Sequence, residues 1–197
     1  MGKSLDAAVL EQVFLSARTV NKFTAQEVSD EQLRQLYDLM KWGPTSMNCQ
    51  PGQYVAVKSP AAKERLLPLL MSGNQDKTRA APVTVIVATD TQFYQHMPEQ
   101  FPANAGAADM FKSNPGLSEA TAQRNGTLQG AYLIVAARML GLDCGPMSGF
   151  DNAAVDAEFF PGGRFRSNFL VNIGYGDPAG NHPRGPRLAF EDRVEIL

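Results

Sequence analysis

Lys41-Trp-Gly-Pro-Thr-Ser-Met-Asn-Cys-Gln-Pro51 is the most informative stretch of this 197-residue chain. A predicted helix ends at Gly43-Pro44, a run of hydroxyl and amide side chains follows, and a strand is predicted beyond it. The run is too polar for a hydrophobic core, and it suits a hydrogen-bonding rim for a heteroaromatic ligand. The same residues are equally compatible with an ordinary polar connection between a helix and a strand.

Helices and strands are predicted on both sides of this stretch. Ser29 and Gln32 form a capping box, which places the start of the preceding helix. Ser59-Pro60 has the form of an N-cap followed by proline at the first helical position. The predicted helices are Leu5–Arg18, Ser29–Met40, Ser59–Leu67, Leu128–Leu140 and Asp151–Phe160, and the predicted strands are Tyr54–Val57, Val83–Ala88 and Phe169–Tyr175.

Two segments in the second half of the chain depart from ordinary patterning. Thr91–Arg124 contains three prolines and scattered aromatic residues, which favours an excursion or lid over a core connection. Leu128–Leu140 is apolar nearly all round, which predicts a helix buried in the domain or at a subunit interface. With no repeat or linker, residues 1–197 are predicted to form one α+β domain.

Composition excludes several classes of protein. The net charge of −2 argues against a broad face for duplex nucleic acid. Two cysteines and two histidines lack the spacing of a metal site, so no metal is expected. The longest mainly apolar run, Ala80–Ala88, is far shorter than the ~20 residues that span a bilayer. No secretory signal is recognisable at the N-terminus, so we expect a soluble, cytoplasmic protein without membrane contact.

Two glycine-rich motifs resemble known patterns without meeting their requirements. Gly174-x-Gly176-x-x-Ala179 matches a dinucleotide fingerprint, but Pro178, Pro183 and Pro186 forbid the helix that must follow it. Gly145–Gly149 resembles the nucleophile elbow of hydrolases, but its serine stands one place too late. A turn flanked by glycines still lets backbone N–H groups approach a flat ligand.

Basic residues form two pairs far apart in the sequence. Arg18 and Lys22 follow the first predicted helix, and Arg184 and Arg187 lie in the irregular tail. Together they would suit a phosphate, because arginine binds phosphate in a bidentate way. Each pair alone is more often a solvated surface feature.

Four segments in the right order resemble the FMN-dependent nitroreductase family from about Leu15 to Leu188. They are Ala17-Arg-Thr-Val-Asn-Lys-Phe23, Pro44-Thr-Ser-Met-Asn-Cys-Gln-Pro51, Gly141-Leu-Asp-Cys-Gly-Pro-Met-Ser-Gly-Phe150 and Pro183-Arg-Gly-Pro-Arg-Leu188. The resemblance implies an α+β fold with a central, mainly antiparallel sheet, flanking helices and an intertwined homodimer. It also implies bound FMN at the subunit interface.

The same resemblance assigns residues to the cofactor. The basic motifs would hold the phosphate end, Met147–Gly149 would pass over flavin N5, and Pro44–Asn48 would come from the partner subunit. Two motifs depart from the family pattern: Ala17 and Asn21 replace two of the three arginines of the early motif, and Ser148 replaces a frequent acidic residue. The implied FMN-binding residues are Arg18, Thr19, Asn21, Lys22, Pro44, Thr45, Ser46, Asn48, Asn74, Lys77, Asn125, Pro146, Met147, Ser148, Gly149, Arg184 and Arg187.

The resemblance implies a ping-pong reductase in which NADPH or NADH reduces FMN and a second substrate is then reduced through N5. Met40–Ser46, Phe93-Tyr94 and Gly145–Asp151 are similar to the malonic semialdehyde reductases of the Rut pyrimidine-degradation pathway. We therefore expect reduction of malonic semialdehyde to 3-hydroxypropanoate, with Lys112 and Arg124 as candidate partners for its carboxylate. The alternatives are a broad NAD(P)H nitro or quinone reductase, and a flavin-binding protein without turnover.

Overall fold

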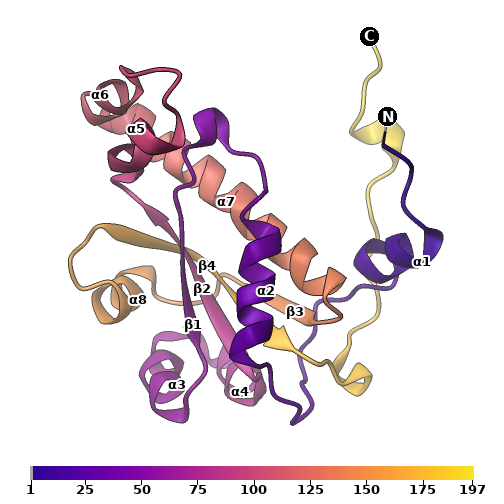
Figure 1. Cartoon of the computed structure of the whole chain (residues 1–197). Helices are drawn as coiled ribbons and strands as arrows, with labels where there is room; N and C mark the ends of the chain where they lie inside the picture. Colours follow the sequence, from indigo (N-terminus) through magenta and orange to yellow (C-terminus); the bar gives the residue numbers. More distant parts are fainter. Residues whose placement is uncertain (1) are drawn as a thin grey trace.

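The computed structural model describes residues 2–197 and shows one sheet between two layers of helices (Figure 1). The strands are antiparallel throughout and lie in the order β1-β2-β4-β3. All eight residues of β2 are buried, as its unbroken apolar run predicts. The strands are β1 (Gly52–Val57), β2 (Val83–Asp90), β3 (Asp143–Met147) and β4 (Phe165–Gly174).

Helices cover both faces of the sheet. On one face, α2 (Asp30–Met40) and α7 (Pro115–Met139) pack on Val83, Val85 and Val87 of β2. On the other face, α3 (Pro60–Leu66), α4 (Ser72–Ala80) and α8 (Asn152–Phe159) lie against the alternate residues of the same strands. The remaining helices are α1 (Ala7–Leu10), α5 (Met97–Gln100) and α6 (Ala107–Lys112), with π or 3-10 turns at Glu11–Leu15, Ser46–Asn48, Leu67–Leu69, Phe93–His96, Pro178–Gly180 and Phe190–Asp192.

Local capping signals place several helices correctly. The Ser29 hydroxyl accepts from the Gln32 backbone N–H while the Gln32 side chain accepts from Ser29, which completes the capping box of α2. The Ser59 hydroxyl caps α3, and the Asp151 carboxylate caps α8. These three helix starts are confirmed because each depends only on residues within one turn.

The structure corrects the prediction for residues 91–124. The irregular excursion ends at Asn114, whose side chain caps the first turn of α7, and the helix then continues without a break to Met139. Gly126 and Gly130 lower the helix propensity, but the structure needs both. A Cβ on Gly126 would lie 2.3 Å from Thr89 Cγ2, and one on Gly130 would lie 2.4 Å from the Phe169 ring, so the glycines let α7 lie directly on the sheet.

Two further predictions need correction, and one helix was not predicted. The Leu5–Arg18 helix is reduced to α1 and a π-helical turn, because most of its apolar side chains are exposed and only Val13 finds a core. Strand β3 replaces the turn expected around Gly145, and it extends the sheet through its pairing with β4. Helix α4 was not predicted, since its sequence lacks an apolar stripe. Within residues 2–197, no helix is long and apolar enough to cross a membrane.

Candidate functional site

A basic cleft of about 480 Å³ lies between the end of the N-terminal helical segment, the C-terminal end of α7 and the irregular tail. Four arginines line it, and no acidic side chain among the described residues does. The positive charge is therefore not neutralised within the cleft, which favours a ligand with an anionic group. The lining residues are Phe14, Ala17, Arg18, Thr19, Asn21, Arg138, His182, Pro183, Arg184, Gly185 and Arg187.

Backbone carbonyl groups hold the arginines in place. Arg18 donates to the His182 carbonyl, and Arg184 donates to the carbonyls of Leu15 and Ala17. These contacts tie the N-terminal segment to the tail across more than 160 residues of sequence. Because a guanidinium has five N–H donors, each arginine keeps donors for a ligand after binding a carbonyl.

The cleft brings together three of the four residues of the two distant basic pairs, and it adds one further arginine. Lys22 does not line the cleft, and its aliphatic stem instead packs on Gly180. Arg138, which the sequence analysis missed, enters from the last turn of α7 and donates to the Val13 carbonyl at 3.1 Å. A basic residue in the last turn of a long helix was the available signal, but it is equally typical of charges that only complement the helix dipole.

Strand β3 leads from this cleft to the second part of the site. The Val20 backbone N–H donates to the Cys144 carbonyl at 3.0 Å, which lays the segment after Arg18 beside β3. Gly145 permits this approach, because a Cβ there would lie 2.5 Å from the Val20 carbonyl oxygen. Ser148 and Gly149 stand four and five residues beyond Cys144, a distance of roughly 13–17 Å in an extended chain. The site therefore suits an elongated ligand with an anionic end.

Gly149 is held from α4 and from the turn before it. Its carbonyl accepts hydrogen bonds from Asn74 Nδ2 at 2.8 Å and from the Met71 backbone N–H at 3.0 Å. A Cβ on Gly149 would lie 2.6 Å from Asn74 Nδ2, so a larger residue would have to displace the Asn74 amide. The amide of Asn74, expected to lie along a flavin, orients the backbone of the glycine that is expected to face N5.

Lys77 lies one turn beyond Asn74 on the same helix. Its side chain is half-buried and forms no salt bridge with any residue from 2 to 197. Burial lowers the pKa of Lys77, because desolvation disfavours its charged form. An ammonium group in this position would favour negative charge on a ligand bound along β3.

The polar stretch between α2 and β1 forms a strained, hydrogen-bonded loop. Met47, Asn48 and Gln50 have φ values of 52°, 51° and 39°, in the left-handed region that side chains rarely adopt. Asn48 Nδ2 donates to the Gln100 carbonyl at 2.8 Å, and the Thr45 hydroxyl accepts from the Gln50 backbone N–H. Strain of this kind persists where the surrounding structure over-determines it, and it is frequent at ligand sites.

The side chain of Asn125 on α7 holds this loop through a hydrogen bond. Its side-chain oxygen accepts from the Ser46 backbone N–H at 2.8 Å, and its nitrogen donates to the Thr121 carbonyl. Asn125 is only 2% exposed, so within one chain its amide is used to hold the loop. The expected contact of Asn125 with a cofactor stays a prediction, as does the contribution of Pro44–Asn48 to a partner's site.

Lys112 and Arg124, which were expected to bind a substrate carboxylate, lie away from Gly149 within one chain. Lys112 ends α6 and lines a cavity on the α7 face of the sheet, whereas Asn74 and Gly149 lie on the opposite face. Arg124 is exposed on α7. Within one chain, neither residue stands beside Gly149.

Known proteins resemble this chain over nearly its whole length. The profile of the nitroreductase family matches residues 15–175. A Burkholderia lata protein, provisionally named an NADH dehydrogenase/NAD(P)H nitroreductase, is 58% identical over 98% of this chain and 98% of its own. A Rhodopseudomonas palustris protein with the same provisional name is 54% identical over all of both chains.

A solved structure shows the same fold. It is a provisionally named nitroreductase from Exiguobacterium sibiricum in complex with FMN, with a TM-score of 0.86 over 100% of this chain and 99% of that one. Its sequence is 19% identical, so this likeness speaks for the fold alone. The predicted α+β architecture with an antiparallel sheet and flanking helices is confirmed.

Proposed function

The chain belongs to the nitroreductase family and is an oxidoreductase, and we propose that it binds FMN and transfers electrons from NAD(P)H to nitroaromatic or quinone acceptors. The observation that carries the proposal is the cleft lined by four arginines at one end of β3, with Gly149 held by Asn74 at the other. An anionic, elongated cofactor fits this arrangement. Two relatives that match this chain over 98% or more of both sequences, at 58% and 54% identity, have NAD(P)H nitroreductase names.

Each part of the chain has a distinct task in this proposal. Arg18, Arg138, Arg184 and Arg187 would hold the phosphate, where charge-assisted hydrogen bonds are strong. FMN, when bound, supplies the hydride chemistry of the reaction. The hydrogen bonds to the Gly149 carbonyl fix the backbone that would face the reactive part of the ring, and Lys77 would stabilise negative charge on it.

We further propose that the enzyme is a homodimer. One chain exposes large apolar side chains along α7, in the loop after α2 and in the tail, among them Tyr132 at 41%, Trp42 at 80% and Phe190 at 55%. Exposed apolar surface of this extent marks an interaction site. In Figure 1 both ends of the chain project away from the sheet, where a second copy would cover them.

The names of the relatives favour the nitro or quinone reductase over the malonic semialdehyde reductase of the Rut pathway. Reduction of malonic semialdehyde stays a second candidate for one reason. Ser148, at the end of β3, is exposed and uncharged, so no side chain at this position repels an anionic acceptor. Lys112 and Arg124 do not add to this case, because within one chain neither lies near Ser148.

A parallel assay of acceptors tests the proposal. The purified protein should be yellow with one FMN per chain, and NADH or NADPH should reduce it under anaerobic conditions. The reduced enzyme is then mixed separately with a nitroaromatic compound, a quinone and malonic semialdehyde, and flavin reoxidation is followed. We expect the first two to reoxidise it faster. Reoxidation by the semialdehyde alone would establish the second candidate, and a colourless protein that binds no added FMN would contradict both.

A further inference from the structure

A second cavity, of about 280 Å³, lies beneath α6 on the α7 face of the sheet. Its walls come from α6, the first turns of α7, the segment after β2 and the start of β4. Thr89 faces this side, because it contacts Gly126 of α7. The sheet therefore separates the cavity from Gly149 of the same chain. Its lining residues are Thr89, Thr91, Tyr94, Phe111, Lys112, Pro115, Ser118, Glu119, Ala122, Gln123 and Arg166.

Ser118 gives this cavity an unused polar group. Its side chain is 5% exposed, and its hydroxyl has no hydrogen-bond partner among residues 2–197. Most buried polar side-chain atoms in proteins are paired, and each exception calls for an explanation. A ligand in the cavity that accepts a hydrogen bond from the Ser118 hydroxyl would supply the missing partner.

The charges around the cavity favour one negative charge on the ligand. Lys112 forms no salt bridge with a described residue, and Arg166 has only a long contact of 3.8 Å with Asp156. The positive end of the 25-residue helix α7 also begins here, at Pro115. Glu119 is the one acidic side chain in the described lining, so the lining carries a net charge of +1 and disfavours a dianion.

The remaining walls suit a flat apolar body. Phe111, Tyr94, Pro115 and Ala122 supply them. The Phe111 ring packs edge-on against Phe93 with centroids 4.9 Å apart, which fixes its orientation. The volume of about 280 Å³ lies just below the ~300–1,000 Å³ found for small-molecule sites, so a single-ring compound fits better than a nucleotide.

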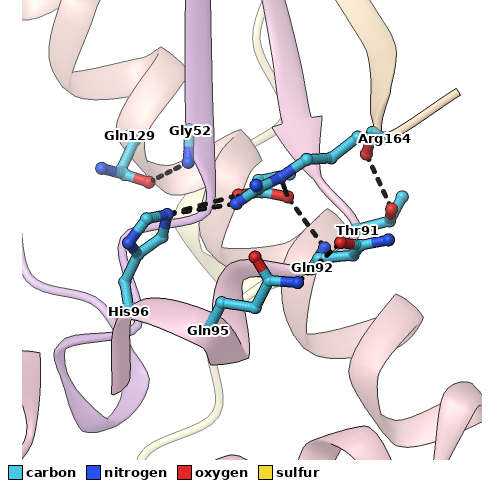
Figure 2. A network of polar contacts seen from close by, with 8 residues as sticks. Gly52, Thr91, Gln92, Gln95, His96, Gln129 and Arg164 are labelled. Carbon is cyan, nitrogen blue, oxygen red and sulfur yellow. Dashed lines mark hydrogen bonds and ion pairs between the residues drawn. The ribbon is translucent and has the colours of Figure 1, made fainter. Parts of the chain in front are cut away.

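A network of polar contacts anchors the segment after β2, which carries Thr91 and Tyr94 of the cavity lining (Figure 2). Arg164 of the loop before β4 donates to the Asp90 carboxylate from Nε at 2.8 Å and from Nη2 at 2.6 Å. The Thr91 hydroxyl donates to the Arg164 carbonyl at 2.7 Å, and the Gln92 backbone N–H donates to Asp90 at 2.8 Å. His96 reaches the same guanidinium from the next turn. These contacts fix the position of the segment that carries Tyr94.

We propose that this cavity is a second binding site, separate from the cofactor, for a small aromatic monocarboxylate. Lys112 binds the carboxylate, the Ser118 hydroxyl donates a hydrogen bond to it, and the ring packs between Phe111 and Tyr94. The site does not depend on the function proposed above, and binding is measured without turnover.

Calorimetric titration of the FMN-loaded protein with benzoate tests the site, with benzamide as its uncharged isostere. Lys112→Met removes the cation, and Ser118→Leu fills the cavity without changing charge. We expect benzoate to bind the parent protein, and to bind both variants at least tenfold more weakly. Its Kd for the parent should also be lower than that of benzamide. Arg124→Met is the matched control, because it removes an exposed cation of α7 that does not line the cavity, and it should bind benzoate like the parent.

The flavin spectrum separates this site from binding over the cofactor. Benzoate in the cavity should leave the visible absorbance of the flavin unchanged. Binding that survives in both Lys112→Met and Ser118→Leu, or that shifts the flavin spectrum in all variants alike, would overturn the proposal. So would the absence of binding at millimolar benzoate. Thermal melting checks that the Ser118→Leu variant is folded. Because Lys112 is exposed, Lys112→Met should fold normally and tests the site even if Ser118→Leu fails to fold.

Discussion

Arg138 lines the basic cleft, a role that the residues next to it in the sequence do not predict. Its guanidinium is half-buried at the basic cleft and is held by the Val13 carbonyl. Replacing Arg138 with methionine should weaken FMN binding by about 1.5–3 kcal/mol, the contribution of one charge-assisted contact, or roughly ten- to a hundred-fold in Kd. Fluorescence titration of the apoprotein with FMN measures this.

Arg193→Met serves as the control for that titration, because Arg193 is an exposed arginine of the tail that does not line the cleft. Arg138→Lys keeps the charge and should restore part of the affinity. Equal FMN affinity in the parent and Arg138→Met would remove Arg138 from the phosphate site.

The two cysteines are predicted to be unreactive in the folded protein. Burial raises the pKa of Cys49 to about 11 and that of Cys144 to about 12, from an ordinary 9.0, so both remain neutral thiols at pH 7 to 9. A thiol-reactive disulfide reagent should label neither at pH 8, and should label both after unfolding. Because the folded pKa values are raised, the stability that the neutral thiols contribute is lost as pH rises above about 9. Rapid labelling of the native protein would contradict the burial.

At the scale of elements, the packing of α7 on the sheet depends on two glycines within the helix. Gly130→Ala places a methyl group 2.4 Å from the ring of Phe169, which is half-buried between the helix and the sheet. We expect this overpacking to lower the free energy of unfolding by about 1–3 kcal/mol. Urea denaturation of the FMN-loaded protein measures the change.

Gly116→Ala is the matched control in the same helix. A Cβ at Gly116 meets nothing closer than 3.9 Å, and alanine favours helix over glycine. Its stability should be unchanged or slightly raised. If Gly130→Ala is as stable as Gly116→Ala, the close contact between α7 and β4 is not as described.

At the scale of the whole molecule, the exposed tail is predicted to be part of the dimer interface. Ile196 is 84% exposed and Phe190 is 55% exposed, and apolar side chains this open are stabilised by burial against a partner. The double variant Phe190→Ser, Ile196→Ser should shift the protein toward monomer in sedimentation equilibrium. It should also release FMN, if the site is shared between subunits.

A second double variant in the same tail controls for the change in sequence. Glu191→Ser with Asp192→Ser alters exposed polar residues and should leave the dimer intact. A parent protein that sediments as a monomer while holding FMN would contradict the proposed assembly.

Residues near one another in sequence determined much of the fold. Ser29 and Gln32 placed the start of α2, the run Val83–Ala88 predicted a strand buried on both faces, and Asp151 placed α8. Each signal is local, because a cap or a periodic pattern acts within a few residues. The pairing of Arg18 with Arg184 was inferred from residue type and family resemblance, and the structure brings both to one cleft.

Only the tertiary structure decided which of these residues meet. It brought Arg138 into the cleft and left Lys22 outside it, and it placed Lys112 on the opposite face of the sheet from Gly149. It also showed why α7 carries glycines that weaken its helical propensity, since Gly126 and Gly130 lie where the helix touches Thr89 and Phe169. Contacts of this kind join residues far apart in the chain. Their positions depend on how helices and strands pack together, and this packing cannot be predicted from a local sequence pattern.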